Sequence, residues 1–352
     1  MKNALLLYGA YGYTGRLITQ IAKQQNCTII LAGRDAQKLE AMSRETGFAW
    51  RAFSLSNVDQ VAAALSDVQV VLHAAGPFIF TAENMLNACI KSGTHYLDIT
   101  GEIDVFEMAA ALHEQAVQAN IMLMPGTGFD VVPTDCMALS LKKALPDATH
   151  LKLAFGTRGG GVSHGTATSM VNKLGGGGAE RVNGKLVPAP LGERSLEVEV
   201  EGFRMFTMSI PWGDLSTAWR TTGIPNITTY TRMSKTVYYS LKAQFLFNWL
   251  LRTNWIRNRL RKRIDAGPAG PSDEQRQRSR SFIYGKVSNA EGQIVEAGFS
   301  APEGYTLTAL ASFHIAQKVM NGQWKPGYQT PAGCYGEQLV FELPNTSSWK
   351  KI

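Results

Sequence analysis

A glycine-rich loop near the N-terminus has the residue types and spacing needed to bind a pyrophosphate. Gly9, Gly12 and Gly15 recur every three residues, directly after an apolar run at 4–8. Glycines at these points permit a tight turn and let helix N-terminal amides approach a phosphate. The alternative is a structural glycine turn in another α/β protein. We predict a dinucleotide site whose contacts are Gly9, Tyr11, Gly12, Tyr13, Thr14 and Gly15.

Arg34 bears on which nicotinamide cofactor such a loop would bind. It follows Gly33 about 20 residues beyond the glycines, where NAD-binding domains carry an acidic residue that binds the ribose hydroxyls. A guanidinium at this point can pair with a 2′-phosphate instead. Asp35 comes next and could cap the following helix. The predicted cofactor is therefore NADP(H); the alternative is NAD, with Arg34 on the solvated surface.

Two further loops are predicted to border the nicotinamide, because they follow strands expected in the same sheet. Ala75, Gly76 and Pro77 end one apolar run; Gly76 would allow close approach and Pro77 would stiffen the turn. Gly126 follows a later run and is predicted as another cofactor contact. The alternative for Ala75, Gly76 and Pro77 is an ordinary turn between a strand and a helix.

Hydrogen-bond donors for a reacting substrate are sought near the same sheet edge. Tyr96 and Thr100 surround the end of an expected strand and are predicted to be catalytic, as donors to a substrate oxygen. Asp98, between them, could be a buried structural carboxylate. His164, in a glycine-rich loop that opens a helix, is the third predicted catalytic residue, as a proton donor. The alternative for His164 is a structural or exposed role.

The elements that must position these residues follow an α/β pattern. Over the first 125 or so residues, short apolar runs alternate with amphipathic stretches, which is typical of βαβ units and a doubly wound parallel sheet. We expect strands at 4–8, 28–32, 49–53, 68–74, 96–99 and 121–124, and helices at 15–24, 36–46, 58–65, 81–92 and 104–120. This is a Rossmann arrangement.

The pattern changes after Pro125. Strands predominate, several with two-residue alternation, which indicates a second α+β domain with a mainly antiparallel sheet. We expect strands at 151–155, 196–200, 203–210, 281–287 and 294–299, and helices at 135–145, 166–174 and 306–321. The predicted division is 1–126 for cofactor binding, completed by 305–352, and 127–304 for substrate and association.

The composition of the chain limits the classes of ligand and partner that we expect. The chain has 352 residues, a formal net charge of +7 and four cysteines that are far apart in sequence, so neither a metal site nor a disulfide framework is expected. A basic balance favours small anionic ligands, and no nucleic-acid motif stands out. The first apolar run is too short for a signal peptide. A cytoplasmic protein is expected.

A segment at 236–264 combines aromatic and basic residues. Tyr238, Tyr239, Trp249 and Trp255 are followed closely by arginines. An amphipathic helix of this kind could rest on a lipid surface, as a peripheral membrane contact, or cover an acyl substrate. The alternative is a helix packed on its own domain with a solvated basic end.

Several motifs together carry a family resemblance. They are Gly-Ala-Tyr-Gly-Tyr-Thr-Gly at 9–15, Leu-Ala-Gly-Arg at 31–34, Ala-Gly-Pro-Phe at 75–78, Tyr-Leu-Asp-Ile-Thr-Gly-Glu at 96–102 and Gly-Phe-Asp-Val-Val-Pro-Thr-Asp at 128–135. In these the chain resembles the saccharopine dehydrogenase-like oxidoreductases, and among them the short members called trans-acting enoyl reductases. The resemblance implies an NADP(H)-binding Rossmann domain and a second domain for substrate and association, and we expect a homodimer.

Three functions remain open at this point. The first is an NADPH-dependent oxidoreductase acting on an enoyl or carbonyl group of an acyl substrate. The second is an amino-acid dehydrogenase that reduces an imine, a reaction that requires paired arginines for substrate carboxylates. Arginines are available for it at Arg158, Arg181, Arg194, Arg204 and Arg220. The third is a protein that senses NADP(H) without turnover.

Overall fold

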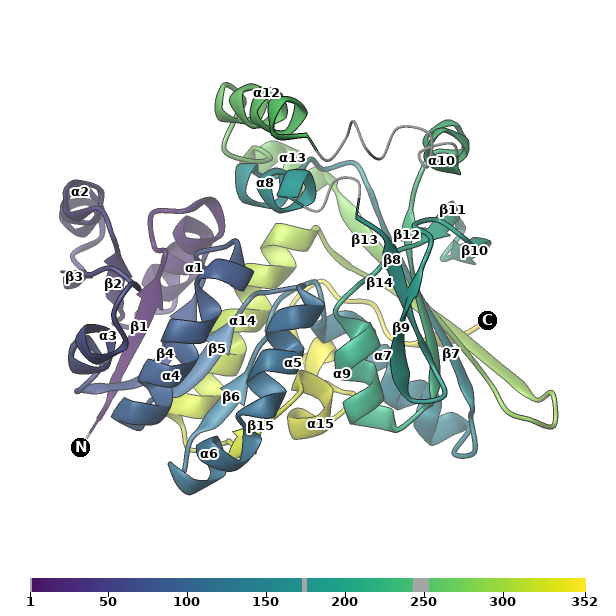
Figure 1. Ribbon diagram of the computed structural model, residues 1–352, viewed down its shortest axis with the longest axis horizontal. Coiled ribbons are helices and arrows are strands. Elements are labelled where there is room, and N and C mark those ends of the chain that lie inside the picture. Colours follow the sequence, from purple (N-terminus) through teal and green to yellow (C-terminus); the bar gives the residue numbers. More distant parts are fainter. Residues whose placement is uncertain (1, 173–175, 243–252) are drawn as a thin grey trace. The chain divides into compact units, whose positions relative to one another are not determined.

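The computed structural model describes residues 2–172, 176–242 and 253–352 of the chain (Figure 1). The chain divides into two compact units. The first comprises Met1–Val132 and Tyr305–Cys334, and the second comprises Pro133–Gly304 and Tyr335–Ile352. Each unit is described by itself.

The first unit is built on a parallel sheet, which in the described chain has seven strands in the order β15-β6-β5-β4-β1-β2-β3. The strands are β1 (Ala4–Tyr8), β2 (Ile30–Gly33), β3 (Trp50–Ala52), β4 (Val68–His73), β5 (His95–Asp98), β6 (Met122–Met124) and β15 (Gly327–Tyr328). Every neighbouring pair is parallel. The sheet confirms the predicted Rossmann arrangement.

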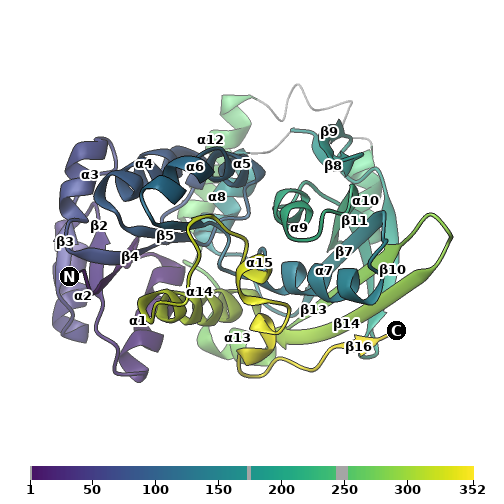
Figure 2. The same cartoon turned by 90° about the horizontal axis from the view of Figure 1, so that it is seen from below.

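Helices cover both faces of this sheet. Figure 2 shows α3 to α6 on one face and α1, α2 and α14 on the other. Their bounds are α1 (Tyr13–Gln24), α2 (Ala36–Thr46), α3 (Val58–Ala64), α4 (Ala82–Ser92), α5 (Ile103–Ala111), α6 (His113–Gln118) and α14 (Gly304–Met320), with a 3-10 turn η1 at Phe78–Phe80. Because both faces are covered, β1 is an unbroken apolar run rather than an alternating one.

Local signals set several of these boundaries. Asp35 caps α2, since its carboxylate accepts the Lys38 amide, and Gly47 ends the helix in the left-handed region at φ 79°. The N-cap of α1 is Gly12, which has no side chain to cap the helix, and the first turn of α1 has no acidic residue. The amino end of α1 is thus built as a site for an anion.

One predicted helix is divided in the structure. The expected helix at 104–120 is two helices, α5 and α6, separated at Leu112. The break brings the His113 ring against β15, where its Nδ1 accepts the Tyr328 amide at 3.1 Å. A Cβ at Gly327 would lie 2.6 Å from the same ring. This long-range contact, invisible in the local pattern, favours the turn over a continuous helix.

The second unit contains a mixed sheet, nine-stranded over the described residues, with the main order β10-β11-β12-β7-β13-β14-β16. Its strands are β7 (His150–Arg158), β8 (Gly178–Val182), β9 (Lys185–Ala189), β10 (Ser195–Val200), β11 (Phe203–Ser209), β12 (Asn226–Arg232), β13 (Arg280–Ser288), β14 (Ile294–Pro302) and β16 (Lys350–Lys351). The pair β12 and β7 is parallel and the other pairs are antiparallel. The predicted mainly antiparallel sheet is confirmed.

The helices of this unit are α7 (Val132–Ala144), α8 (His164–Asn172), α9 (Asp214–Thr222), α10 (Lys235–Lys242), α12 (Asn254–Asp265) and α13 (Asp273–Arg278), with α15 (Pro331–Tyr335) at the boundary and a 3-10 turn η3 at Leu339–Glu342. Sequence reasoning missed α9 and β12. The strand β12 was not recognised because its threonine-rich sequence lacks an apolar run, although β-branched residues favour strands.

Two predicted segments meet the limits of the described chain. The expected helix at 166–174 is α8, and residues 173–174 lie outside the described residues. The aromatic and basic segment at 236–264 contains α10 and α12, and residues 243–252, including Trp249, lie outside the described residues. Over the part of the chain that is described, no helix combines the length and hydropathy needed to cross a bilayer.

The C-terminal region differs from the expected division. Residues 305–352 were expected to complete the cofactor domain together. In the structure Tyr305–Cys334 falls in the first unit, whereas Tyr335–Ile352 falls in the second. The physical reason is strand pairing, since β16 extends the second sheet antiparallel to β14.

Candidate functional site

The glycine loop after β1 packs so closely that side chains would not fit. Gly9 has φ +88°, and its amide donates to the Ala32 carbonyl at 2.8 Å. A Cβ at Gly9 would lie 2.9 Å from the Ala74 carbonyl carbon, and one at Gly15 would lie 2.7 Å from the Ala10 oxygen. The loop therefore turns tightly against the end of β4 and leads straight into α1, as pyrophosphate binding requires.

Tyr11 connects this loop to the end of β2. A Cβ at Gly33 would lie 2.5 Å from the Tyr11 ring, and the Arg34 amide donates to the Tyr11 hydroxyl at 3.2 Å. The Lys38 ammonium lies 5.5 Å from the centroid of the same ring. Arg34 is exposed and Asp35 is occupied as the α2 cap. The Lys38 ammonium and the Arg34 backbone thus both lie beside Tyr11, where a 2′-phosphate would bind.

Sequence reasoning missed Lys38. Its signal was its position four residues after Arg34, in the first turn of the helix expected at 36–46, where two basic residues can share one anion. The described geometry fits NADP(H): an uncapped helix amino end for the pyrophosphate, and Arg34 with Lys38 for the 2′-phosphate.

Asp98 forms hydrogen bonds with the loops that follow β5 and β6. Its side chain is fully buried. One carboxylate oxygen accepts the amides of Thr100 at 2.9 Å and Gly126 at 2.8 Å, and the other accepts the Tyr96 hydroxyl at 2.6 Å. The backbone carbonyl of Asp98 also accepts the Thr127 amide and hydroxyl, each at 2.7 Å. Residues far apart in sequence are held together by one residue.

Burial and hydrogen bonding act in opposite directions on this carboxyl. Burial raises the pKa of Asp98 to about 7, and the three donated hydrogen bonds, which favour the charged form, oppose that rise. The nearby Glu102 carboxylate raises the pKa further.

Glu102 joins the β5 loop to the β4 loop. Its buried carboxylate accepts the Phe78 amide at 3.1 Å and the Ile79 amide at 3.0 Å, one on each oxygen. The Glu102 amide donates to Thr100 Oγ1 at 3.1 Å. This role was not predicted; an acidic residue directly after Gly101, opposite the Ala-Gly-Pro-Phe loop, was the signal that could have indicated it.

The predicted catalytic residues Tyr96 and Thr100 are both fully buried. The Tyr96 hydroxyl is committed to Asp98, and Thr100 contributes its amide to Asp98 and its hydroxyl oxygen to Glu102. This placement favours a role in positioning the loops, and a direct catalytic role stays a prediction. The amide of Gly126, a predicted cofactor contact, is likewise bonded to Asp98.

Ala75, Gly76 and Pro77 lie at the end of β4, as the sequence suggested. Thr81 holds this loop, since its hydroxyl donates to the Ala75 carbonyl at 2.9 Å. The β4 loop, the glycine loop and the Asp98 loops all follow strands of one parallel sheet, so they share its carboxyl edge, where ligands of doubly wound folds bind.

His164 belongs to the second unit. It begins α8, its ring Nε2 lies 2.7 Å from Asp265 Oδ1, and its amide donates to the Ala269 carbonyl at 2.9 Å. About half of the side chain is exposed. The ring is oriented by a carboxylate and accessible to solvent, and its proton-donor role stays a prediction.

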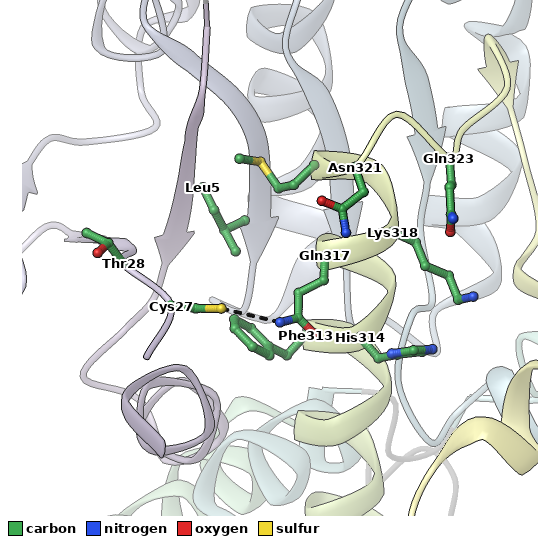
Figure 3. Close-up of a pocket in the computed structure, with 10 residues that line it drawn as sticks. Leu5, Cys27, Thr28, Phe313, His314, Gln317, Lys318, Asn321 and Gln323 are labelled. Atoms are coloured by element: carbon green, nitrogen blue, oxygen red, sulfur yellow. Dashed lines mark hydrogen bonds between the residues drawn. The ribbon is translucent and has the colours of Figure 1, made fainter. Parts of the chain in front are cut away.

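A cavity of about 510 Å³ lies elsewhere in the first unit (Figure 3). Leu5 and Cys27 precede or begin their strands, so the cavity is at the amino edge of the sheet, away from the glycine loop. Gln317 of α14 crosses it and donates to Cys27 Sγ at 3.3 Å. Within the described residues, no group of three or more His, Cys, Asp or Glu side chains is arranged to hold a metal.

Comparison with known proteins assigns the first unit. The family model described as "Saccharopine dehydrogenase NADP binding domain" matches residues 5–124. These residues are therefore similar to the NADP-binding domain of saccharopine dehydrogenases. The cofactor of the first unit is NADP(H), in agreement with the surroundings of Arg34.

Curated relatives match between about a third and half of the chain. The chain is 31% identical over 153 residues to a saccharopine dehydrogenase-like oxidoreductase of Mus musculus, covering 37% of this chain and 35% of that protein. It is 32% identical over 154 residues to a trans-acting enoyl reductase of Mycobacterium ulcerans, covering 41% and 37%. The matches thus span little more than a third of these relatives.

A solved structure resembles the whole chain. Saccharopine dehydrogenase (L-Glu forming) from Saccharomyces cerevisiae superposes with a TM-score of 0.70, covering 99% of this chain and 100% of that one, at 13% sequence identity. At this identity the likeness establishes a shared fold. It extends the resemblance from the NADP-binding domain to the second unit.

The role of Arg34 can be tested by cofactor preference. We expect Arg34→Ala to weaken NADPH binding roughly ten- to a hundredfold and NADH binding little, since about 1.5–3 kcal/mol of charge-assisted pairing is lost. Binding would be measured by nicotinamide fluorescence. Arg44→Ala is the matched control, because Arg44 lies on α2, the helix that follows Arg34, and pairs with Glu40. Equal weakening of both cofactors would contradict the assignment.

The buried Asp98 carboxyl predicts a pH-dependent stability. With a folded pKa of about 7, above the unfolded value of 3.8, the folded state retains a proton that the unfolded state releases, so stability falls as pH rises through this window. Relative to Asp98→Asn, the free energy of unfolding should fall by about 2.5 kcal/mol between roughly pH 5 and pH 7. Urea unfolding of both proteins checks this; parallel pH profiles would refute it.

Proposed function

We propose that this protein is an NADPH-dependent oxidoreductase that reduces an enoyl or carbonyl group of an acyl substrate. The observation that carries the proposal is apolar surface beside the cofactor loops. Ile79 and Phe80 follow the Ala75–Gly76–Pro77 turn and are 38% and 76% exposed. Large apolar side chains held in water beside a cofactor site are suited to an apolar substrate.

The hydrogen bonds that Glu102 accepts from the β4 loop, called here the Glu102 clamp, explain why Ile79 and Phe80 face outward. By accepting the amides of Phe78 and Ile79, it fixes the backbone of the η1 turn. Phe78 then turns into the core against His73, with ring centroids 5.3 Å apart, while Phe80 stays exposed. The clamp presents an apolar surface that a flexible loop would tend to bury.

When bound, NADPH supplies the hydride for such a reduction. The chain's own contribution is positioning and proton supply. The Asp98 and Glu102 networks fix the loops beside the expected nicotinamide site, which limits the reorganisation that a reaction would require. We assign Tyr96 and Thr100 to this positioning, and we retain His164, oriented by Asp265, as the candidate proton donor.

The alternative of imine reduction needs arginines available for substrate carboxylates. Several of the candidates are engaged inside the second unit. Arg181 is buried and donates to the carbonyls of Leu215 and Gly184, Arg194 pairs with Glu180, and Arg204 pairs with Glu199. These commitments favour an acyl substrate over an amino-acid substrate with several carboxylates.

A protein that senses NADP(H) without turnover is the other alternative. Two observations weigh for the enzyme: curated relatives are named oxidoreductase and enoyl reductase, and the loop network is rigidly hydrogen-bonded at the cofactor edge. The two readings differ in one measurable property, which is turnover.

The reaction itself is the first test. We expect the purified protein to oxidise NADPH with a long-chain enoyl thioester or ketone, followed by the absorbance of the reduced nicotinamide. Turnover with an oxo acid and an amine, but with no enoyl or carbonyl compound, would favour the amino-acid dehydrogenase. Tight NADPH binding without turnover of any of these substrates would favour the sensor.

The apolar surface predicts a chain-length effect. Phe80→Ser should lower kcat/KM for a long-chain substrate roughly tenfold or more, because burying a phenyl side chain against an acyl chain is worth about 1.5–3 kcal/mol. A short-chain substrate should be nearly unaffected. Ile294→Ser, at another exposed apolar residue on β14, is the matched control. Equal losses for long and short chains would exclude an acyl contact at Phe80.

A further inference from the structure

The helix α12 has a strongly cationic sequence. Asn254–Asp265 contains five basic residues and one acidic residue, Asp265. The Asp265 carboxylate is already bonded to His164 of α8. The basic residues are Arg257, Arg259, Arg261, Lys262 and Arg263.

The residues of α12 are divided between two faces. Ile256, Leu260 and Ile264 recur every four residues and are partly buried, while α12 packs against α8 (Figures 1 and 2). Trp255, Arg259 and Lys262 recur at helical spacing on another side and are exposed. The Arg259 guanidinium lies 5.8 Å from the centroid of the Trp255 ring. The outward face therefore combines an indole with cations.

These cations have no acidic partner in the described part of the chain. Within the described chain, no carboxylate pairs with Arg259, Lys262 or Arg263. Solvated lysines and arginines on an ordinary surface are commonly interspersed with acidic residues, and here the sign is uniform. A face of this kind attracts an extended anionic surface.

The helix α10 behaves differently, although it belongs to the same aromatic and basic segment of the sequence. Its Tyr238 is buried and packs on Phe206, with ring centroids 5.2 Å apart. Lys235 pairs with Glu197, and Lys242 donates to the Glu193 carbonyl. The alternative of packing within the domain thus holds for α10, and among the described residues of 236–264 the outward face of α12 is left to bind a partner.

Apolar side chains stand exposed on and beside the two packed helices. Trp255 of α12 is 67% exposed, Met170 of α8 is 60% exposed, and Val162, just before α8, is 54% exposed. Tryptophan with lysine and arginine is the combination that sits at the headgroup level of a bilayer, with rings below the charged groups. Nucleic acid would also bind the cations, but its binding would gain little from the exposed apolar side chains of Met170 and Val162.

We propose that the outward face of α12, formed by Trp255, Arg259, Lys262 and Arg263, docks on an anionic lipid surface. The cations bind the headgroups, and Trp255 inserts at the interface. The interaction is peripheral and salt-sensitive, because charges at a solvated surface are screened. It goes beyond the proposed reductase and does not depend on it.

Vesicle sedimentation tests this with the full chain. The protein should sediment with vesicles of equal parts phosphatidylcholine and phosphatidylglycerol, and should be released as sodium chloride rises from about 0.05 to about 0.5 M. Vesicles of phosphatidylcholine alone should bind it weakly. The triple variant Arg259→Gln/Lys262→Gln/Arg263→Gln should bind anionic vesicles about a hundredfold less tightly, and Trp255→Ala should also bind less.

A charge-matched control separates a local face from net charge. Arg44→Gln/Lys91→Gln/Arg204→Gln removes three cations that already have acidic partners, so it should keep most of the binding. Equal losses in both triple variants, equal binding to neutral vesicles, or binding to duplex DNA without binding to vesicles would overturn the proposal. NADPH binding by the α12 variant should be unchanged, which shows folding and keeps this test separate from the reductase assay.

Discussion

The carboxylate of Asp98 ends the strand β5 in a place with no access to solvent, and such a group is destabilising unless its oxygens accept hydrogen bonds. Both oxygens do so, from Tyr96, Thr100 and Gly126. The donors come from β5, from the loop after it and from the loop after β6. Because removing any one of them would leave a buried acceptor unpaired, these segments are constrained to one arrangement.

Glu102 extends the same constraint to the β4 loop. Its carboxylate binds the amides of Phe78 and Ile79, while the turn at Gly9 presses against Ala74 from the other side. The β4 loop is therefore held between the glycine loop and the β5 loop. A cofactor and a substrate at this edge would contact backbone that is already ordered. The entropic cost of ordering these loops is incurred during folding rather than on binding.

In the second unit, the role of a basic residue depends on whether its side chain is already paired. Arg181, Arg194 and Arg204 are committed to carbonyls or carboxylates of their own unit, and they contribute to its internal order. Arg259 and Lys262 are equally basic in sequence but have no such partners within the described residues, so their charge is available to a partner. Composition alone does not distinguish these two groups, because pairing depends on which strands and helices lie side by side.

The sequence by itself determined the features that depend on neighbouring residues. The buried run of β1, the Asp35 cap of α2 and the glycine turn at 9–15 are local, and they are enough to predict a parallel dinucleotide-binding sheet and its cofactor. Tertiary structure decided what depends on distant partners. The helix break at Leu112 is set by β15, and the burial of Tyr96 and the clamp of Glu102 arise from loops brought together at one sheet edge. Hydrogen bonds between segments far apart in the chain leave no periodic pattern in the sequence. They can therefore be identified only once the packing of these segments is known.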